Sequence, residues 1–385
     1  NGGIGGAGGI SKTGAGILNL AASESYTGPT NVLAGTLKLN AADRIPDTSP
    51  LFIAAGAKFD KTAGQDYVGS LSGSGTIDTG SNTGTFGLGL ANINTTWSGT
   101  LIGTGATNFT TRGTSVITLA MPSTAQWTGT QYIDTGTIRI GSSVQQFPTG
   151  ATWTIGNIQS SVNAGGWLDL NGYSQTIGTL NFYGSASTVN SQAGIYLGSG
   201  GVLTIGGTIT TNAHYNGGTQ AAFISGTNGA AVNMQNAQRA ITVYRSLNLG
   251  AGEAELVIDA DITGGGTSGA WYKSGGGTLR MKGLNLLTGT VVNRFDAGTT
   301  LLDYAPVTAL QASLNNTNRL NPLGGLELRG GTVTFLGSAL APIVQNVAGL
   351  TLPATANSNT GAYSNVGIVT ASAVALDGTS VVSGS

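Results

Sequence analysis

One passage recurs three times along this chain of 385 residues, at 12–39, 112–140 and 273–302. Each copy begins with a basic residue, which is Lys12, Arg112 or Lys273, and continues through a turn rich in glycine or threonine. A short apolar alternation follows, and a Gly-Thr pair leads into a further strand. Supersecondary units that repeat in this way bury their apolar faces by stacking on copies of themselves. The repeat therefore predicts a solenoid.

Short apolar alternations occur along most of the chain, separated by Gly, Asn and Thr. Leu37-Lys38-Leu39, Ile138-Arg139-Ile140 and Leu203-Thr204-Ile205 each place two apolar side chains on one strand face and a polar one on the other. Strands this short do not form stable hairpins, whereas stacked coils pair each of them in parallel with its equivalents above and below. We therefore expect an all-β fold, a parallel β-helix or β-solenoid. The general crossover preference predicts that it is right-handed.

The expected architecture is a single elongated domain that spans residues 1–385. If a coil uses ~20–25 residues and rises ~4.8 Å, the chain contains roughly 15–19 coils and forms a rod on the order of 70–90 Å long. A second type of repeat lies near 166–182 and 331–352, where a Gly-flanked apolar strand is followed by a segment that starts at Gln175 or Gln345.

Composition limits the partners of the chain. Charged residues make up 8% of the sequence, the formal net charge is -1 and cysteine is absent. So small a charge provides no long-range attraction for nucleic acid or for an anionic membrane. No segment approaches the ~18 consecutive apolar residues of a membrane-spanning helix. We expect no nucleic-acid partner and no membrane insertion of this segment.

Four acidic residues are the best candidates for catalysis. Parallel β-helices can host enzymes that cleave polysaccharides, and these need grouped carboxylates. Glu253 and Glu255, like Asp259 and Asp261, have the i, i+2 spacing that would place both members of a pair on one face of a strand. The favoured alternative is a polar outward surface that flanks the buried segment 256–258.

Other residues offer weaker candidates for a site. His214 is the only histidine, and without cysteine or a second histidine a zinc site is nearly excluded. The glycine clusters at 264–266 and 275–277 are not followed by the Lys-Ser/Thr of a phosphate-binding loop, so we interpret them as turns. The sequence predicts no catalytic residue, no cofactor-binding residue and no metal ligand.

The five tryptophans have two possible roles. They could form an exposed stripe on which sugars stack, or they could close the ends and corners of the inward apolar column, which we favour. These residues are Trp97, Trp127, Trp153, Trp167 and Trp271.

The first copy of the repeat has a recognisable pattern. Residues 12–39 read Lys-x-Gly-x-Gly-x-Leu-x-Leu, then Tyr-Thr-Gly-x-Thr-x-Val, then Ala-Gly-Thr-Leu-x-Leu. This pattern resembles the autotransporter-associated β-strand repeat of bacterial autotransporter passenger domains. The resemblance implies a β-helical passenger that is exposed outside the bacterial cell, secreted or at its surface. It implies no single activity.

Three functions remain open from the sequence. The main hypothesis is a non-catalytic extracellular structural solenoid, a rod or filament subunit that associates head-to-tail or continues in a larger repeat chain. The alternative is an adhesin or carbohydrate-binding passenger, whose partners would be glycans or other cells. Its binding loops would be the irregular stretches 41–69, 210–229 and 307–321. A polysaccharide-degrading enzyme is the third hypothesis.

Overall fold

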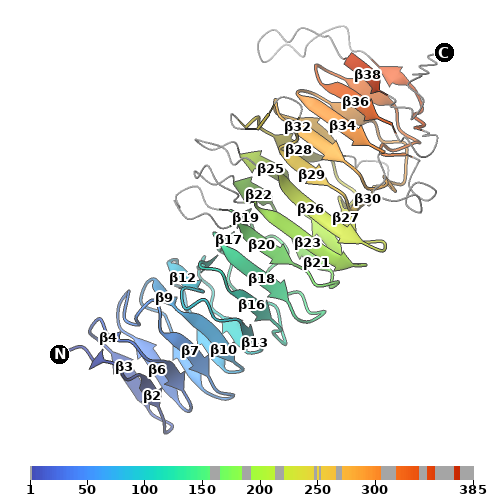
Figure 1. The fold of residues 1–385 in the computed structure, drawn as a ribbon. Helices are drawn as coiled ribbons and strands as arrows, with labels where there is room; N and C mark the ends of the chain where they lie inside the picture. Colours follow the sequence, from blue (N-terminus) through green and yellow to red (C-terminus); the bar gives the residue numbers. More distant parts are fainter. Residues whose placement is uncertain are drawn as a thin grey trace.

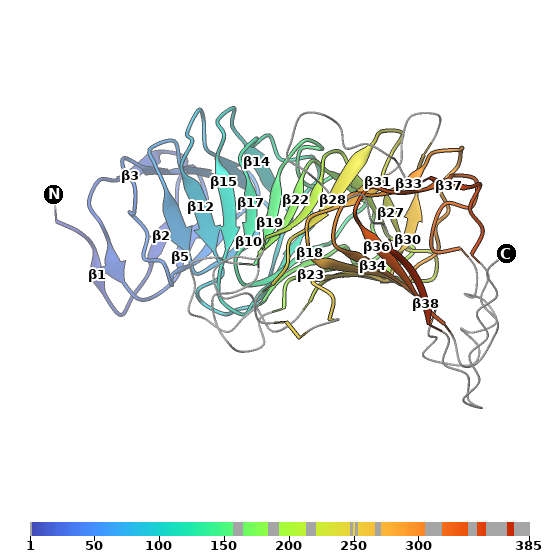
Figure 2. The same ribbon diagram turned by 90° about the horizontal axis from the view of Figure 1, so that it is seen from above.

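The computed structural model describes residues 2–156, 165–183, 192–212, 221–246, 249–250, 253–265, 271–304, 318–337, 345–351 and 368–372. Within these ranges the regular elements are short β-strands, and every pair of neighbouring strands is parallel. Figures 1 and 2 show the strands stacked one above another along an elongated body, with the chain advancing steadily from the N-terminus to the C-terminus. The expected parallel β-solenoid is confirmed; its handedness stays a prediction.

One sheet, which we call the long sheet, runs through the whole stack. Its fifteen strands follow one another in chain order, one from each coil. They are β2 (Ile10–Lys12), β5 (Thr30–Val32), β7 (Pro50–Ile53), β10 (Ser70–Gly73), β13 (Thr95–Trp97), β16 (Val116–Leu119), β18 (Gly136–Ile140), β20 (Gly166–Asp169), β23 (Gly194–Ser199), β26 (Ala222–Thr227), β29 (Leu256–Ile258), β32 (Thr278–Met281), β34 (Thr299–Asp303), β36 (Thr332–Leu336) and β38 (Ile368–Ser372).

A second sheet of twelve strands forms another wall of the solenoid. Its strands are β9 (Asp66–Val68), β12 (Thr85–Leu88), β15 (Asn108–Thr111), β17 (Gln131–Ile133), β19 (Trp153–Ile155), β22 (Leu180–Tyr183), β25 (Ile209–Asn212), β28 (Arg239–Val243), β31 (Trp271–Ser274), β33 (Asn293–Phe295), β35 (Leu326–Leu328) and β37 (Leu350–Thr351).

Shorter sheets complete the walls of some coils. A five-stranded sheet contains β3 (Ile17–Leu20), β6 (Thr36–Leu39), β8 (Lys58–Asp60), β11 (Thr76–Asp78) and β14 (Thr100–Ile102). A four-stranded sheet contains β21 (Gln175–Ile177), β24 (Val202–Ile205), β27 (Ala231–Asn233) and β30 (Asp261–Thr263). A two-stranded sheet pairs β1 (Gly5–Gly6) with β4 (Ser25–Tyr26).

Coil length is regular only in the first part of the chain. From β2 to β18, equivalent positions of the long sheet lie 20 to 24 residues apart. Leu168 then follows its equivalent Ile138 after 30 residues, and Ile258 follows Ile224 after 34. The expected coil of ~20–25 residues is therefore wrong for the central coils, because residues are added between strands without changing the strand register.

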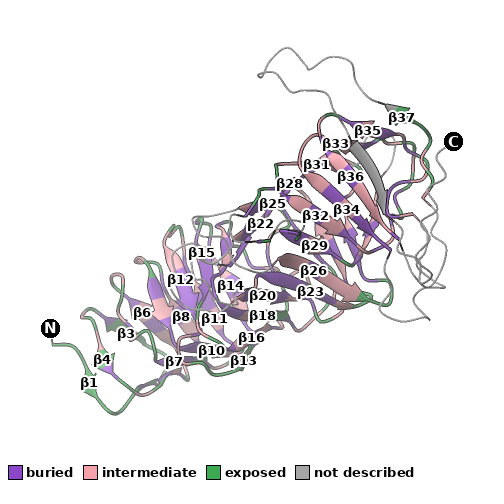
Figure 3. Cartoon of the chain, turned by 45° about the horizontal axis from the view of Figure 1, so that its top comes forward, coloured by how far each residue is buried: buried purple, intermediate pink, exposed green. Residues whose placement is uncertain are grey.

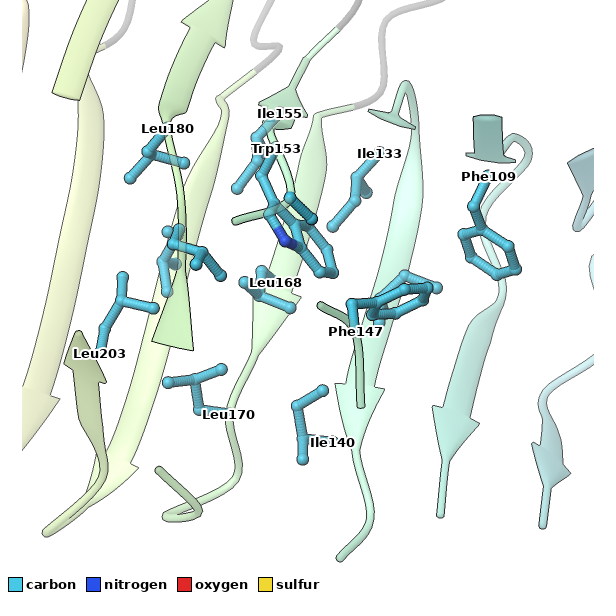
Figure 4. Close-up of a cluster of buried hydrophobic side chains, with 14 of the residues drawn as sticks. Phe109, Ile133, Ile140, Phe147, Trp153, Ile155, Leu168, Leu170, Leu180 and Leu203 are labelled. Carbon is cyan, nitrogen blue, oxygen red and sulfur yellow. The ribbon is translucent and has the colours of Figure 1, made fainter. Parts of the chain in front are cut away.

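The interior is a continuous apolar column. Alternate residues of each strand point inward, and in-register pairing places them above the equivalent residues of the next coil. Phe86 on β12 pairs with Phe109 on β15, and the two ring centroids are 6.4 Å apart. Figure 4 shows Phe147, Trp153 and Leu168 converging on the same interior, and Figure 3 shows buried positions alternating along the strands.

Residues 41–69, predicted to be an irregular stretch inserted between the repeats, belong to the stack. Strands β7, β8 and β9 lie in this stretch and bury Leu51, Ile53 and Phe59 completely. The apolar residues are spaced as in the other coils. The polar and charged residues between them make this apolar alternation difficult to recognise in the sequence. That prediction was wrong. Most of the predicted insertion 307–321 lies outside the described residues.

Replacement of one inward residue tests the column. Ile138→Ala should lower the free energy of unfolding by about 2–5 kcal/mol, because it removes buried methyl groups and leaves a cavity between two coils. Thr118→Ala, at a half-buried outward position of the neighbouring strand, should change it by less than about 1 kcal/mol. Denaturant unfolding monitored by circular dichroism gives both values. Equal effects of the two substitutions would contradict the inward placement of Ile138.

Candidate binding face on the long sheet

The basic residue at the start of the repeat is buried in two of the three copies. Lys12 is buried, and its Nζ donates to the carbonyl oxygens of Thr13 (2.9 Å), Gly14 (2.7 Å) and Ala34 (2.9 Å). Ala34 lies on the next coil, so the ammonium joins two successive turns of the solenoid.

Lys273 repeats this arrangement. Its Nζ donates to the carbonyl oxygens of Ser274 (3.0 Å), Gly275 (2.6 Å) and Ala297 (2.9 Å), and the last of these again lies on the next coil. Burial lowers the pKa of Lys273 to about 8, partly offset by the charge of Glu255. The lysine of the repeat therefore stabilises stacked turns.

The Gly-Thr pair of the repeat follows from the same close stacking. Gly35 has a φ of 67°, and a Cβ atom there would come within 2.5 Å of the carbonyl oxygens of Gly14 and Gly16 in the coil before. Gly298 has a φ of 69° and lies against Gly275 and Gly277 in the same way. Only glycine combines this conformation with so close an approach of two backbones.

The second copy uses a different arrangement. The side chain of Arg112 lies over the ring of Tyr67, with its guanidinium carbon 4.7 Å from the ring centroid. Its Nε is 3.4 Å from Oδ2 of Asp134 on the next coil. An arginine at this position therefore also links coils, but at the surface.

The glutamine of the second repeat type connects adjacent coils as well. Oε1 of Gln175 accepts the backbone N–H of Gln146 at 2.8 Å, and its Nε2 donates to the carbonyl of Val144 at 3.0 Å. Oε1 of Gln345 accepts the N–H of Arg319 at 2.7 Å. In both cases the amide completes the hydrogen bonding of the preceding coil, which the sequence pattern alone did not reveal.

The acidic candidates for catalysis do not share strand faces. Glu253 and Glu255 precede β29, and Glu255 is buried rather than outward. Its carboxylate accepts the backbone N–H groups of Ser246 (3.0 Å) and Thr278 (2.5 Å). The predicted outward orientation of Glu255 was wrong, because its carboxylate turns inward to accept two backbone N–H groups, that of the buried Ser246 and that of Thr278.

The aspartate pair is divided between two sheets. Asp259 follows β29 of the long sheet, whereas Asp261 begins β30 of the four-stranded sheet. Asp259 accepts the hydroxyl of Ser225 (3.1 Å) and the N–H of Gly226 (3.2 Å), and Asp261 accepts the N–H of Leu284 (2.9 Å). Each carboxylate thus contacts the backbone of a neighbouring coil.

The other candidates for a site were His214 and the two glycine clusters. His214 lies outside the described residues, as does Gly266. Gly275 has a φ of 76° and begins the bend at 275–277 between β31 and β32, as expected for a turn. Among the described residues, no three His, Cys, Asp or Glu side chains are grouped to hold a metal ion.

Four of the five tryptophans are buried in the interior. Trp97, Trp127, Trp153 and Trp271 are at most 3% exposed, so they cannot form an exposed stripe. Trp167 differs, because it alternates with the buried Leu168 on β20 and is only half-buried.

Trp167 belongs to an outward group of three rings, which we call the aromatic cluster: Trp167 on β20, Tyr196 on β23 and Phe223 on β26. Trp167 stacks on Tyr196 with 5.3 Å between ring centroids and 14° between ring planes. Phe223 lies 5.1 Å from Trp167 and 5.0 Å from Tyr196. Tyr196 is 45% exposed. Figure 1 shows their three strands side by side on the long sheet.

A glycine makes room for the aromatic cluster. Gly194 pairs with Trp167 on one side and with Phe223 on the other. A Cβ atom at Gly194 would lie 2.5 Å from the ring of Phe223. The ring therefore covers the backbone of the neighbouring coil, an arrangement that compensates for the missing side chain of a strand glycine.

Charged and hydroxyl groups flank the aromatic cluster. Asp169 pairs in register with Tyr196, and its Oδ2 accepts Nε of Arg139 at 2.8 Å. On the other side Ser225 pairs with Tyr196 and donates to Asp259. Partial burial and the nearby Asp169 raise the pKa of Tyr196, so its hydroxyl keeps its proton at neutral pH.

The aromatic cluster lies where the repeat is most interrupted. In four consecutive coils the connection from the second sheet to the long sheet has nine to twelve residues, at 156–165, 184–193, 213–221 and 244–255. Other connections of this type between β9 and β36 have one to six residues. Three of the four long connections lead directly into β20, β23 and β26. Only the third overlaps a predicted insertion, 210–229.

Removal of a buried lysine tests its role. Lys273→Met should lower the free energy of unfolding by about 2–4 kcal/mol, because three carbonyl oxygens in stacked turns lose their donor. Lys58→Met is the control. Lys58 pairs with Asp78 at 2.6 Å but is 37% exposed, so its loss should cost about 1 kcal/mol or less. Equal losses in denaturant unfolding would contradict the proposed role of Lys273.

A buried aspartate predicts that the stability of the chain depends on pH. Asp66 is completely buried, and burial raises its pKa to about 7, while burial lowers the pKa of Lys61 to about 8. Between about pH 4 and pH 7 the folded chain holds a proton on Asp66 that the unfolded chain releases. Stability from this group is therefore greatest below about pH 4 and decreases as the pH rises through 7.

The variant Asp66→Asn isolates this effect. We compare the free energy of unfolding of the variant with that of the wild type. The difference between the two should change with pH, by at most about 1.4 kcal/mol per pH unit between pH 4.5 and 6.5. The wild type should lose stability relative to the variant as the pH increases. Parallel stability curves of the two proteins over this interval would show that the pKa of Asp66 is not raised.

Comparison with known proteins finds two similarities. Residues 10–39 match the passenger-associated transport repeat. Over 337 residues the chain is 29% identical to the protein named adhesin BmaC autotransporter from Brucella suis biovar 1 (strain 1330). The match covers 80% of this chain but only 9% of the relative, so the chain spans a small part of that protein's length. No solved structure matches the chain.

Among the residues that the structure describes, no helix has the length and hydropathy that crossing a bilayer requires. Residues 10–39 thus carry a passenger-associated transport repeat, and most of the chain is distantly homologous to part of an autotransporter adhesin.

Proposed function

We propose that the chain is a non-catalytic, surface-exposed segment of a bacterial adhesin, in which the solenoid is a rigid rod that presents an adhesive face. The observation that carries this proposal is the similarity of most of the chain to a relative that is named an adhesin. Passenger segments act outside the cell, so the proposal includes exposure at the bacterial surface or secretion.

The geometry supports a rod with fixed outer faces. Each inner strand of the long sheet is hydrogen-bonded to the strand before and the strand after it, and the interior is filled from β2 to β36 by inward apolar side chains. Outward side chains are therefore held in rows at the spacing of the strands, about 4.8 Å. A binding group made of such side chains is held in place by the strands themselves and does not depend on a flexible loop.

A structural rod without adhesive activity is the second candidate. The first coils favour it, because three of the four residues in their outward row on the long sheet, Ser11, Asn31 and Ser72, are small and polar. The fourth is Phe52. Continuation of the rod in a larger chain and head-to-tail association belong to this proposal. The third hypothesis, an enzyme, has less support, because Glu255, Asp259 and Asp261 bind backbone donors of adjacent segments.

A bead assay distinguishes adhesion from a purely structural role. Beads coated with the folded chain should bind cultured epithelial cells at least about tenfold more than beads coated with the same chain after thermal unfolding, because adhesion requires the ordered outer faces. Cell counts per bead give the ratio. If folded and unfolded coatings bind cells equally, the adhesive proposal is wrong and the structural rod is favoured.

A further inference from the structure

If the chain is an adhesive passenger, as proposed above, its adhesive face can be assigned. We propose that the aromatic cluster of Trp167, Tyr196 and Phe223, with the polar groups beside it, is a binding subsite for a pyranose ring of a cell-surface glycan. The inference deepens the proposed function by naming the ligand class and the residues.

The aromatic cluster is not required for the interior of the rod. On the same strands the inward positions are filled by Leu168, Ile195 and Ile224, which are almost completely buried. Trp167 and Tyr196 extend from the opposite face, where most neighbouring coils carry Thr, Ser or charged residues. Three large rings on this face therefore need an explanation outside core packing.

The chemistry around the rings suits a sugar. A pyranose has apolar C–H faces and a rim of hydroxyl groups, so it binds best where an apolar surface is bordered by hydrogen-bonding groups. The aromatic cluster provides the apolar surface. Arg139 and Asp169 lie on one side and Ser225 and Asp259 on the other, in the same outward row as Tyr196. The protonated Tyr196 hydroxyl adds a donor.

A protein partner fits this surface less well. A stable protein interface buries about 800 Å² on each side and has a broad apolar centre. Here the apolar area consists of three rings, one of which also covers Gly194, and of Val257, which pairs with Phe223. The Arg139–Asp169 ion pair borders this area beside Tyr196. So small an apolar surface suits one or two sugar rings better than a protein interface.

The local fold agrees with a specialised site. At six residues each, β23 and β26 are the longest strands within the described ranges. Their pairing register shifts between Tyr196 and Ser199, immediately after the aromatic cluster. Irregularities of this kind redirect side chains and often lie next to binding sites. Together with the long connections before β20, β23 and β26, they mark these coils as different from the regular repeat.

The experiment uses a double variant that retains the fold. Trp167→Thr with Tyr196→Thr removes the two stacked outward rings but leaves Phe223 over Gly194, and threonine is favourable at outward strand positions. The control is Phe52→Thr, which removes an outward aromatic side chain, 37% exposed, from β7 of the same sheet. Unfolding midpoints of all three proteins establish that they are folded.

Binding is measured directly and on cells. The direct assay uses polyacrylamide conjugates of lactose, chitotriose and sialyllactose with the immobilised chain. The cell assay uses coated beads, with and without mild periodate oxidation of the cell-surface glycans. We expect at least one conjugate to bind, and expect the double variant to lose at least about tenfold in affinity while the Phe52→Thr control does not change. Periodate should reduce cell binding by the wild type and have little further effect on the double variant.

The failures can be told apart. Undiminished cell binding by the double variant would overturn the assignment of the subsite and leave the adhesive function intact. Cell binding that is lost in the double variant but resists periodate, without binding of any conjugate, would mean that the aromatic cluster contacts protein and would overturn the glycan assignment. Absence of wild-type cell binding would contradict the proposed function, and absence of conjugate binding in addition would contradict the subsite as well.

Discussion

Parallel, in-register pairing of each short strand with the same strand of the next coil is the interaction on which the structure depends. A strand of three residues has too few hydrogen bonds to be stable by itself or in a hairpin. In the long sheet each inner strand has a partner on both sides, and each inward side chain has an equivalent above and below. Apolar residues can then form one column although no coil has a core of its own.

The repeated residues support this pairing. Lys12 and Lys273 connect the carbonyl groups of two successive turns, and Gly35 and Gly298 allow those turns to approach closely. The repeated residues thus make the contacts between coils. A binding site has to use other positions, whose side chains do not take part in these contacts. Outward residues can change without altering the stack, and this is where the aromatic cluster lies.

The sequence predicts the architecture well because period-two alternation and turn glycines are local signals. It predicts less about individual side chains. Glu255 looks outward from its spacing but is buried, because it lies in the bend before β29 and not in the strand itself. Residues 41–69 look irregular, although Leu51, Ile53 and Phe59 keep the spacing of the core.

The aromatic cluster was only partly predictable from the sequence. A sugar-binding stripe of tryptophans was one of two alternatives, but four of the five are in the core and only Trp167 faces outward. Its neighbours Tyr196 and Phe223 are 29 and 56 positions away in the sequence. Coil lengths in this region vary, so the register that brings the rings together cannot be counted from a fixed period. The long connections before β20, β23 and β26 are the signal that could have indicated it.

Distances between spin labels on outward residues of the long sheet test the stacked register most directly. The chain has no cysteine, so pairs of cysteines introduced at Ser11, Thr118 and Thr334 can be labelled specifically. These residues lie on β2, β16 and β36, which are five and eight strands apart in the sheet. At ~4.8 Å per strand, pulsed electron paramagnetic resonance should give about 24 Å for Ser11 to Thr118, about 38 Å for Thr118 to Thr334 and about 62 Å for Ser11 to Thr334. Distances that do not increase with the number of intervening strands would contradict the solenoid on which the account rests.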